Sequence, residues 1–227
     1  TPDRVELNSV TINSEEISAD FTGGFEFATN TLLLDWVLNR VTLERYLSGM
    51  QVSNVSGAGH LQLVTDSDGV DATLELGPLL GELNSYPLSI LGSLQVQDSE
   101  ITDINLTATN DTNSLQVNGP VAPELDLDWQ LNAPRLQQVW TGLSGNVQGS
   151  GRLTGSVAEP LITGQLQGQA LELSLDDAVY SMREFSADAT SSASSDTVQL
   201  HLQGLGMQNS GNYNEVLQNA DLRLVGT

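Results

Sequence analysis

A few residues in the chain are of types that could bind a metal ion. The run Asp66-Ser67-Asp68-Gly69-Val70-Asp71 has the alternating aspartates of a calcium loop, but it lacks the full series of ligands and the closing glutamate. We therefore expect a hairpin turn there. His60 and His201 are of the type that zinc favours, yet they stand 141 residues apart (201 − 60 = 141) with no third ligand in view. The sequence predicts no metal site and no cofactor.

The chain contains no recognisable catalytic set. Its serine-rich stretches lack the Gly-x-Ser-x-Gly turn that exposes a nucleophile, and no histidine lies near a plausible nucleophile. The pair Asp176-Asp177 could in principle supply the two carboxylates of a glycosidase. Adjacent residues of a strand face opposite ways, however, so these side chains cannot converge on one bond. We predict that the protein is not an enzyme and has no catalytic residues.

Charge excludes further classes of function. The 227 residues include 29 acidic and 7 basic side chains, which gives a net charge of −22, and all seven bases are arginine. Such a surface repels phosphate backbones, so we expect no nucleic-acid partner, and it offers no basic patch to an anionic membrane. The chain has no cysteine, which rules out disulfides and thiolate chemistry.

The elements that must position the remaining residues are strands. Apolar and polar residues alternate in Leu125-Asp126-Leu127-Asp128-Trp129-Gln130-Leu131, the period of a strand with one buried face. More than a dozen such segments are separated by turn clusters such as Asn110-Asp111-Thr112-Asn113. Short turns of this kind join antiparallel neighbours. The sequence therefore predicts an all-β fold, an elongated, curved, mostly antiparallel sheet with an apolar interior.

Two segments depart from this alternation. Pro134 to Leu143 has apolar residues at helical spacing, its proline suits the first turn of a helix, and Gly145 follows its end. Arg40 to Met50 repeats the pattern. Each segment predicts a short amphipathic helix that covers one end of the sheet, caps the groove or contacts a partner.

The chain also contains an internal repeat. Leu34-Asp35-Trp36-Val37-Leu38-Asn39 matches Leu127-Asp128-Trp129-Gln130-Leu131-Asn132 at five of six positions, with an offset of 93 residues (127 − 34 = 93). A glycine-rich strand follows each copy at nearly the same distance, because Val55 and Val147 are 92 residues apart (147 − 55 = 92). The sequence predicts repeats over about 32–122 and 125–227, which favours an elongated array.

These residues resemble a known family. Leu127 to Leu136, Val139 to Gly145, Gly149 to Gly155 and Glu159 to Gly164 are similar to the conserved C-terminal region of the TamB family, the inner-membrane subunits of the translocation and assembly module, which has AsmA-like relatives. The similarity covers Leu125 to about Leu175 and reaches Leu34 to Leu63 through the repeat.

The resemblance implies a fragment, residues 1–227, of a larger periplasmic protein of a Gram-negative bacterium. Such proteins form a long repeating β-groove, or β-taco, with an apolar interior. They meet an outer-membrane barrel of the TamA/Omp85 type and are linked to phospholipid movement and outer-membrane protein assembly. The inner-membrane anchor of the family is expected to be absent here, because the chain begins at Thr1 and has neither a signal peptide nor an apolar run of about 18 residues.

An apolar groove could shield the acyl chains of phospholipids, because each methylene removed from water gains about 0.8 kcal/mol. The alternative is that the same residues form a closed sandwich core. Trp36 and Trp129 either contact lipid or, as we favour, pack beneath the helices against Tyr46-Leu47 and Val139-Trp140. The predicted lining comprises Leu34, Trp36, Leu38, Leu74, Leu76, Leu94, Val96, Leu106, Leu125, Leu127, Trp129, Leu131, Leu166, Leu171, Leu173, Leu200, Leu202, Leu222 and Leu224.

A second class of function is a secreted β-solenoid adhesin or passenger domain with a filled core. Solenoid coils repeat every ~20–30 residues, whereas this chain repeats after 93 residues (127 − 34 = 93) with an embedded helix. Phospholipid that co-purifies with the protein would favour the groove over the adhesin.

Overall fold

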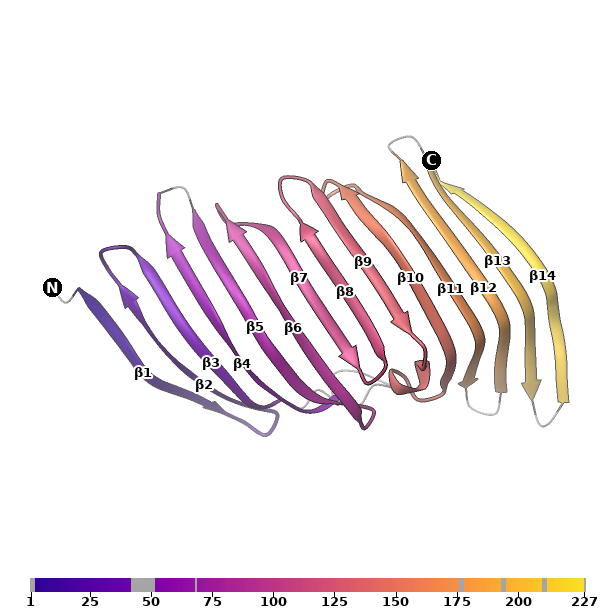
Figure 1. The fold of residues 1–227 in the computed structure, drawn as a ribbon, viewed down its shortest axis with the longest axis horizontal. Coiled ribbons are helices and arrows are strands. Elements are labelled where there is room, and N and C mark those ends of the chain that lie inside the picture. The colour runs from indigo at the N-terminus through magenta and orange to yellow at the C-terminus, as the bar shows by residue number, and fades with distance from the viewer. Residues whose placement is uncertain are drawn as a thin grey trace. The chain divides into compact units, whose positions relative to one another are not determined.

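A computed structural model describes residues 3–41, 52–67, 69–175, 178–192, 195–209 and 212–226. These residues form fourteen strands and one short 3-10 helix, and the order of strands in the hydrogen-bonded sheet is their order in the sequence (Figure 1). The elements are β1 (Arg4–Asn13), β2 (Ile17–Glu26), β3 (Thr31–Val41), β4 (Val52–Thr65), β5 (Val70–Leu83), β6 (Tyr86–Gln97), β7 (Glu100–Asn110), β8 (Asn113–Pro120), β9 (Leu125–Ala133), η1 (Leu136–Gln138), β10 (Leu143–Gly155), β11 (Pro160–Leu175), β12 (Ala178–Ser192), β13 (Ser195–Asn209) and β14 (Asn212–Gly226).

The chain divides into two compact units. Unit 1 comprises residues 1–111 and 117–123 and contains β1 to β7. Unit 2 comprises residues 112–116 and 124–227 and contains β9 to β14. Strand β8 contributes residues to both units.

Tight turns explain why successive strands are antiparallel. Asn84-Ser85 joins β5 to β6, and Asp98-Ser99 joins β6 to β7, with φ between 51° and 67° at all four residues. Two consecutive residues with positive φ match the right-handed twist of paired strands. The predicted turn at Asn110-Asp111-Thr112-Asn113 likewise joins β7 to β8. The predicted all-β, antiparallel fold is confirmed.

The register in unit 1 aligns the apolar positions of neighbouring strands. Directly opposed residues of an antiparallel pair lie on the same face. Leu34 of β3 opposes Leu61 of β4, which opposes Leu74 of β5, which opposes Leu94 of β6, which opposes Ile104 of β7. One face of unit 1 is therefore apolar across these strands.

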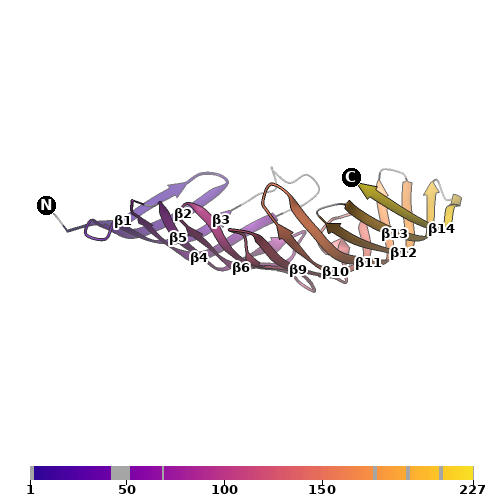
Figure 2. The ribbon, with the colours of Figure 1, turned by 90° about the horizontal axis from the view of Figure 1, so that it is seen from above.

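Unit 2 has an apolar face built in the same way. One row of directly opposed residues crosses all six strands from β9 to β14. The row comprises Leu131, Gly149, Leu166, Ala187, Leu200 and Leu222. Figure 2 shows these strands following one another as a single layer.

An additional residue in β11 keeps its apolar side chains in phase. Leu143 opposes Leu173 and Val147 opposes Gly168, so four steps along β10 (147 − 143 = 4) match five steps along β11 (173 − 168 = 5). Ala170, with φ of 50°, lies in this bulge. Leu166 and Leu171 are an odd number of residues apart (171 − 166 = 5), so strict alternation would place them on opposite faces, and the extra residue returns them to one face.

The bulge continues as a row across unit 2. The residues that continue the row from Ala170 are Arg183 of β12, Gly204 of β13 and Gln218 of β14. In each strand, the residues on either side of this position are paired with those of the neighbouring strand. Bulges bend the strands that contain them, and Figure 1 shows a bend in each of β11 to β14. Sequence alternation alone gave no sign of this row.

The apolar faces are half-buried, and the predicted apolar interior is not enclosed by the described residues. Most large apolar side chains on these faces retain part of their surface exposed, including Ile12 at 50% and Leu222 at 48%. Among the described residues, the buried apolar ones are Ala19, Trp36, Val55 and Leu83 in unit 1 and Leu125, Leu127 and Ala133 in unit 2.

The predicted helix from Pro134 to Leu143 was wrong. The chain forms one 3-10 turn, η1, and then returns to strand at Leu143, which opposes Leu173. The Gln138 side chain is 1% exposed, and its Oε1 accepts a hydrogen bond from Asn113 Nδ2 at 3.0 Å. A buried amide held in this way fixes the segment as a tight connection, so the apolar spacing that suggested a helix instead spans a turn and the start of a strand.

The other predicted helix, Arg40 to Met50, lies largely outside the described residues. Arg40 and Val41 are the last residues of β3. Among the described residues there is no helix with the length and apolar character needed to cross a membrane.

Candidate functional site

The register brings the predicted lining residues of unit 1 together on one face. Trp36 opposes Gly59, which opposes Leu76, and Leu76 opposes Gly92, which opposes Leu106. The eight predicted residues on this face are Leu34, Trp36, Leu38, Leu74, Leu76, Leu94, Val96 and Leu106.

The eleven predicted lining residues of unit 2 also share a face. Leu171 and Leu173 join it because of the bulge at Ala170. Leu125 and Leu127 are buried, whereas Leu222 and Leu224 of β14 are 48% and 62% exposed. The full set is Leu125, Leu127, Trp129, Leu131, Leu166, Leu171, Leu173, Leu200, Leu202, Leu222 and Leu224.

Both tryptophans lie against glycines of the next strand. A Cβ on Gly59 would lie 2.5 Å from Trp36 Cε2, and a Cβ on Gly151 would lie 2.7 Å from Trp129 Nε1. Trp129 also reaches one strand further, because a Cβ on Gly164 would lie 2.9 Å from its Cζ2. A side chain on Gly59 or Gly151 would overlap the ring, so the close packing of each tryptophan requires glycine at these two positions. The helix under which Trp129 was expected to pack is absent, and the partners expected for Trp36 lie outside the described residues.

The opposite face is polar, and two of its basic side chains in unit 2 pair with acids. Arg152 of β10 donates two hydrogen bonds to the Asp126 carboxylate, which hold the pKa of that carboxyl below its usual value and raise the pKa of the guanidinium. His201 Nδ1 lies 2.6 Å from Asp221 Oδ1. These groups are exposed, so each pair contributes little to stability.

In unit 1 the same kind of pairing occurs on the polar face. His60 Nδ1 lies 2.8 Å from Asp35 Oδ1 on the neighbouring strand. The Asp20 carboxylate accepts hydrogen bonds from Thr11 Oγ1 at 2.6 Å and Asn39 Nδ2 at 2.7 Å, and these bonds lower its pKa. In the part of the chain that the structure describes, no three acidic or histidine side chains are grouped so as to hold a metal ion.

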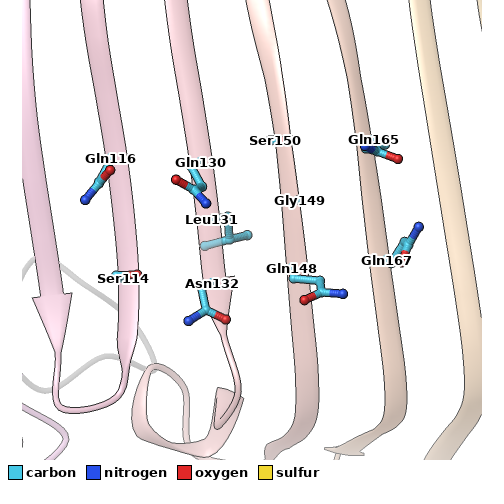
Figure 3. Close-up of a pocket in the computed structure, with 10 residues that line it drawn as sticks. All are labelled: Ser114, Gln116, Gln130, Leu131, Asn132, Gln148, Gly149, Ser150, Gln165 and Gln167. Atoms are coloured by element: carbon cyan, nitrogen blue, oxygen red, sulfur yellow. The ribbon is translucent and has the colours of Figure 1, made fainter.

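A cluster of uncharged amides forms a shallow hollow on the polar face of unit 2, and sequence reasoning missed it. Figure 3 shows glutamine and asparagine side chains from neighbouring strands projecting on the same side. The signal was present in the sequence, since Gln165 and Gln167 alternate with apolar residues in β11 and Gln148 does so in β10. The hollow is lined by Ser114, Gln116, Gln130, Leu131, Asn132, Gln148, Gly149, Ser150, Gln165 and Gln167.

Such a hollow can hydrogen-bond water or a neutral polar group. It contains no charge with which to recognise an anion or a cation. The apolar face, by contrast, offers a broad surface from which water is expelled when another apolar surface covers it. The amide hollow therefore suits a neutral polar group, and the apolar face suits another apolar surface.

Comparison with known proteins agrees with the resemblance in the sequence. The family model described as "TamB, N-terminal domain" matches residues 1–227. The family is therefore confirmed, but the predicted placement in its C-terminal region is not, because the matching model describes the N-terminal domain.

One curated relative is "Translocation and assembly module subunit TamB" of Haemophilus influenzae (strain ATCC 51907 / DSM 11121 / KW20 / Rd). It is 23% identical over 174 residues, which cover 74% of this chain and 13% of the relative. The chain thus spans about an eighth of the length of that relative. No solved structure matches the chain. Because the family model covers every residue, the chain belongs to the TamB family.

Proposed function

We propose that this chain is a segment of a periplasmic scaffold whose apolar sheet faces shield the acyl chains of phospholipids. The observation that carries the proposal is the alignment of apolar residues across successive strands, in rows that stay half-exposed. An acyl chain laid along such a row would remove apolar surface of both partners from water. The phospholipid headgroup would stay outside, in water.

The family supports a proposal for the role of the whole protein. The relative is named a subunit of a translocation and assembly module. We infer that the full-length protein is anchored in the inner membrane, meets an outer-membrane barrel of the TamA/Omp85 type, and supports phospholipid transport and outer-membrane protein assembly. In this role it is a scaffold and not an enzyme.

The two similar segments favour an array in which one unit is repeated, over about 32–122 and 125–227. Trp36 opposes Gly59 and Trp129 opposes Gly151, so the matching residues have the same partners in both segments. An array of this kind extends one surface along the chain.

The adhesin alternative has less support. Coils of a parallel β-helix stack as parallel strands, whereas every strand pair with a described register is antiparallel. A filled core would also bury its large apolar side chains more completely than Leu222 and Leu224 are buried.

Two matched substitutions in β14 test the proposal. Leu222 lies on the apolar face and Asn219 on the polar face, opposite Gln203, and both are exposed. Leu222→Asp and Asn219→Asp therefore place a carboxylate on opposite faces of one strand. We expect native mass spectrometry to find co-purified phospholipid with the wild type and Asn219→Asp, and less with Leu222→Asp. A folded wild-type chain without lipid, or equal loss in both variants, would contradict the proposal.

A further inference from the structure

Several glycines on the apolar face of unit 2 are covered by side chains from neighbouring strands. A Cβ on Gly168 of β11 would overlap the ring of Phe185, which opposes it in β12 and whose Cδ1 would lie 2.7 Å away. A Cβ on Gly149 of β10 would lie 2.7 Å from Leu166 Cδ1. These side chains therefore lie across the adjacent strand instead of standing away from the sheet.

The tryptophans do the same. The Trp129 ring covers Gly151 and Gly164, and the Trp36 ring in unit 1 covers Gly59. At Gly59, Gly149, Gly151, Gly164 and Gly168, a large side chain from another strand fills the space that the missing side chain leaves. The apolar face is consequently nearly flat at these positions.

The central rows of this face carry no charge. Three rows of directly opposed residues, which begin at Trp129, Leu131 and Ala133 in β9, contain no charged residue as far as β14. The hollows found in unit 2, such as those bounded by Gln167 or by Asp188, open among polar side chains. A protein partner anchors its large side chains in pockets. A level, uncharged surface instead suits a linear apolar chain.

We propose that these ring-on-glycine contacts keep the apolar face clear for an unbranched acyl chain, with Gly168 and Phe185 as positioning residues. This inference rests on the proposed acyl-chain function. We call the central rows of this face, which begin at Trp129, Leu131 and Ala133, the level track. A flat surface of this kind has no closed end, so it sets no limit on the length of the acyl chain. Complete burial of one methylene raises the affinity for the acyl chain about fourfold. A surface that covers only one side of the methylene gives about half of that free energy, so the affinity rises roughly twofold for each methylene.

Gly168→Ala tests the contact directly. The nearest backbone atom to the new methyl group, Asn146 O, would lie 3.1 Å away, so the Phe185 ring is the group that must move. A ring lifted from the sheet obstructs the track. We expect a roughly fivefold loss of affinity for long acyl chains, equivalent to two or three methylene contacts.

The matched controls are Phe185→Ala and the double variant Gly168→Ala/Phe185→Ala. Phe185→Ala removes the ring and leaves the track open, so we expect affinity close to that of the wild type. In the double variant the methyl group has no ring to displace, so affinity should return. Binding of lysophosphatidylcholines of increasing chain length to the 227-residue chain is measured by native mass spectrometry, and circular dichroism melts confirm folding.

The outcomes separate this inference from the function on which it rests. A steady rise of affinity with chain length, lost in Gly168→Ala and restored in the double variant, supports the level track. Acyl binding that stops rising at a fixed chain length, or that is unchanged in Gly168→Ala, overturns the track and leaves the acyl-chain function standing. A folded wild-type chain that binds no lysophosphatidylcholine overturns both.

Discussion

Strands β3–β4 of unit 1 and β9–β10 of unit 2 have the same pairing on the apolar side. Leu34 opposes Leu61 and Trp36 opposes Gly59 in the first pair. In the second pair Leu127 opposes Leu153, and a tryptophan again opposes a glycine. The residue types and their spacing are thus reproduced where side chains must fit against one another.

The two regions differ in what surrounds this shared pairing. The strand that follows presents Leu76 beside Gly59 in unit 1 and Gly164 beside Gly151 in unit 2. Trp36 accordingly is only 9% exposed, whereas Trp129 spreads over two glycines and is less deeply buried.

The polar sides differ in chemistry. A histidine, His60, pairs with Asp35 in unit 1, and an arginine, Arg152, pairs with Asp126 in unit 2. The comparison teaches that shape constrains the apolar face closely, while the solvated face tolerates different partners for its acids.

A carboxylate at the matching leucine of either region should destabilise the fold strongly. Leu34→Asp and Leu127→Asp put an unpaired charge on the apolar face, and we expect each to lower the free energy of unfolding by about 4 kcal/mol. Urea denaturation monitored by tryptophan fluorescence measures the change. Asp128→Asn, one residue away on the polar face, should change stability little. Equal damage from Leu127→Asp and Asp128→Asn would contradict the two-faced sheet.

The shared glycines should tolerate no side chain. A Cβ on Gly59 would clash with Trp36 and the Glu75 carbonyl oxygen, and one on Gly151 with Trp129 and the Thr163 carbonyl oxygen. Since backbone cannot move aside cheaply, we expect Gly59→Val and Gly151→Val each to cost about 3 kcal/mol in the same denaturation experiment.

A milder substitution is the control. Gly164→Ala meets its nearest atoms at 2.9 Å and should cost about 1 kcal/mol. If valine at Gly151 were tolerated as well as alanine at Gly164, the close packing of ring on glycine would be wrong.

Alternation along the chain, with the turn clusters between its segments, was enough to predict the strands, their antiparallel pairing and which apolar residues share a face, because a period of two decides which side chains share a face. It did not predict register, which depends on bulges. Ala170 is an ordinary alanine in the sequence, yet its φ of 50° is what brings Leu171 to the face of Leu166.

The helix from Pro134 to Leu143 failed for a different reason. Its apolar spacing is helical, but the segment is held by the Asn113 side chain, more than twenty residues earlier, which binds the backbone of Arg135 and the buried Gln138. Local spacing contains no information on such a distant contact, so tertiary structure overrode it.

The two tryptophans should differ in how much they contribute to stability. Trp36→Ala removes a nearly buried ring and should cost about 3 kcal/mol, whereas Trp129→Ala removes a more exposed ring and should cost about 2 kcal/mol. Thermal melts of both variants at one pH measure the difference. A larger loss for Trp129→Ala would mean that its contact with two glycines outweighs burial.

The smallest effect belongs to the polar pairs. The hydrogen bonds from Arg152 lower the pKa of Asp126, so the folded chain favours the carboxylate more than the unfolded chain does. This contribution is complete above the unfolded pKa of about 3.9 and is lost as the pH falls through the lower folded pKa. Arg152→Gln should therefore lower the melting temperature slightly at pH 7, and the difference from the wild type should vanish in strong acid. A difference that persists there would place the role of Arg152 in packing along its aliphatic stem and not in its charge.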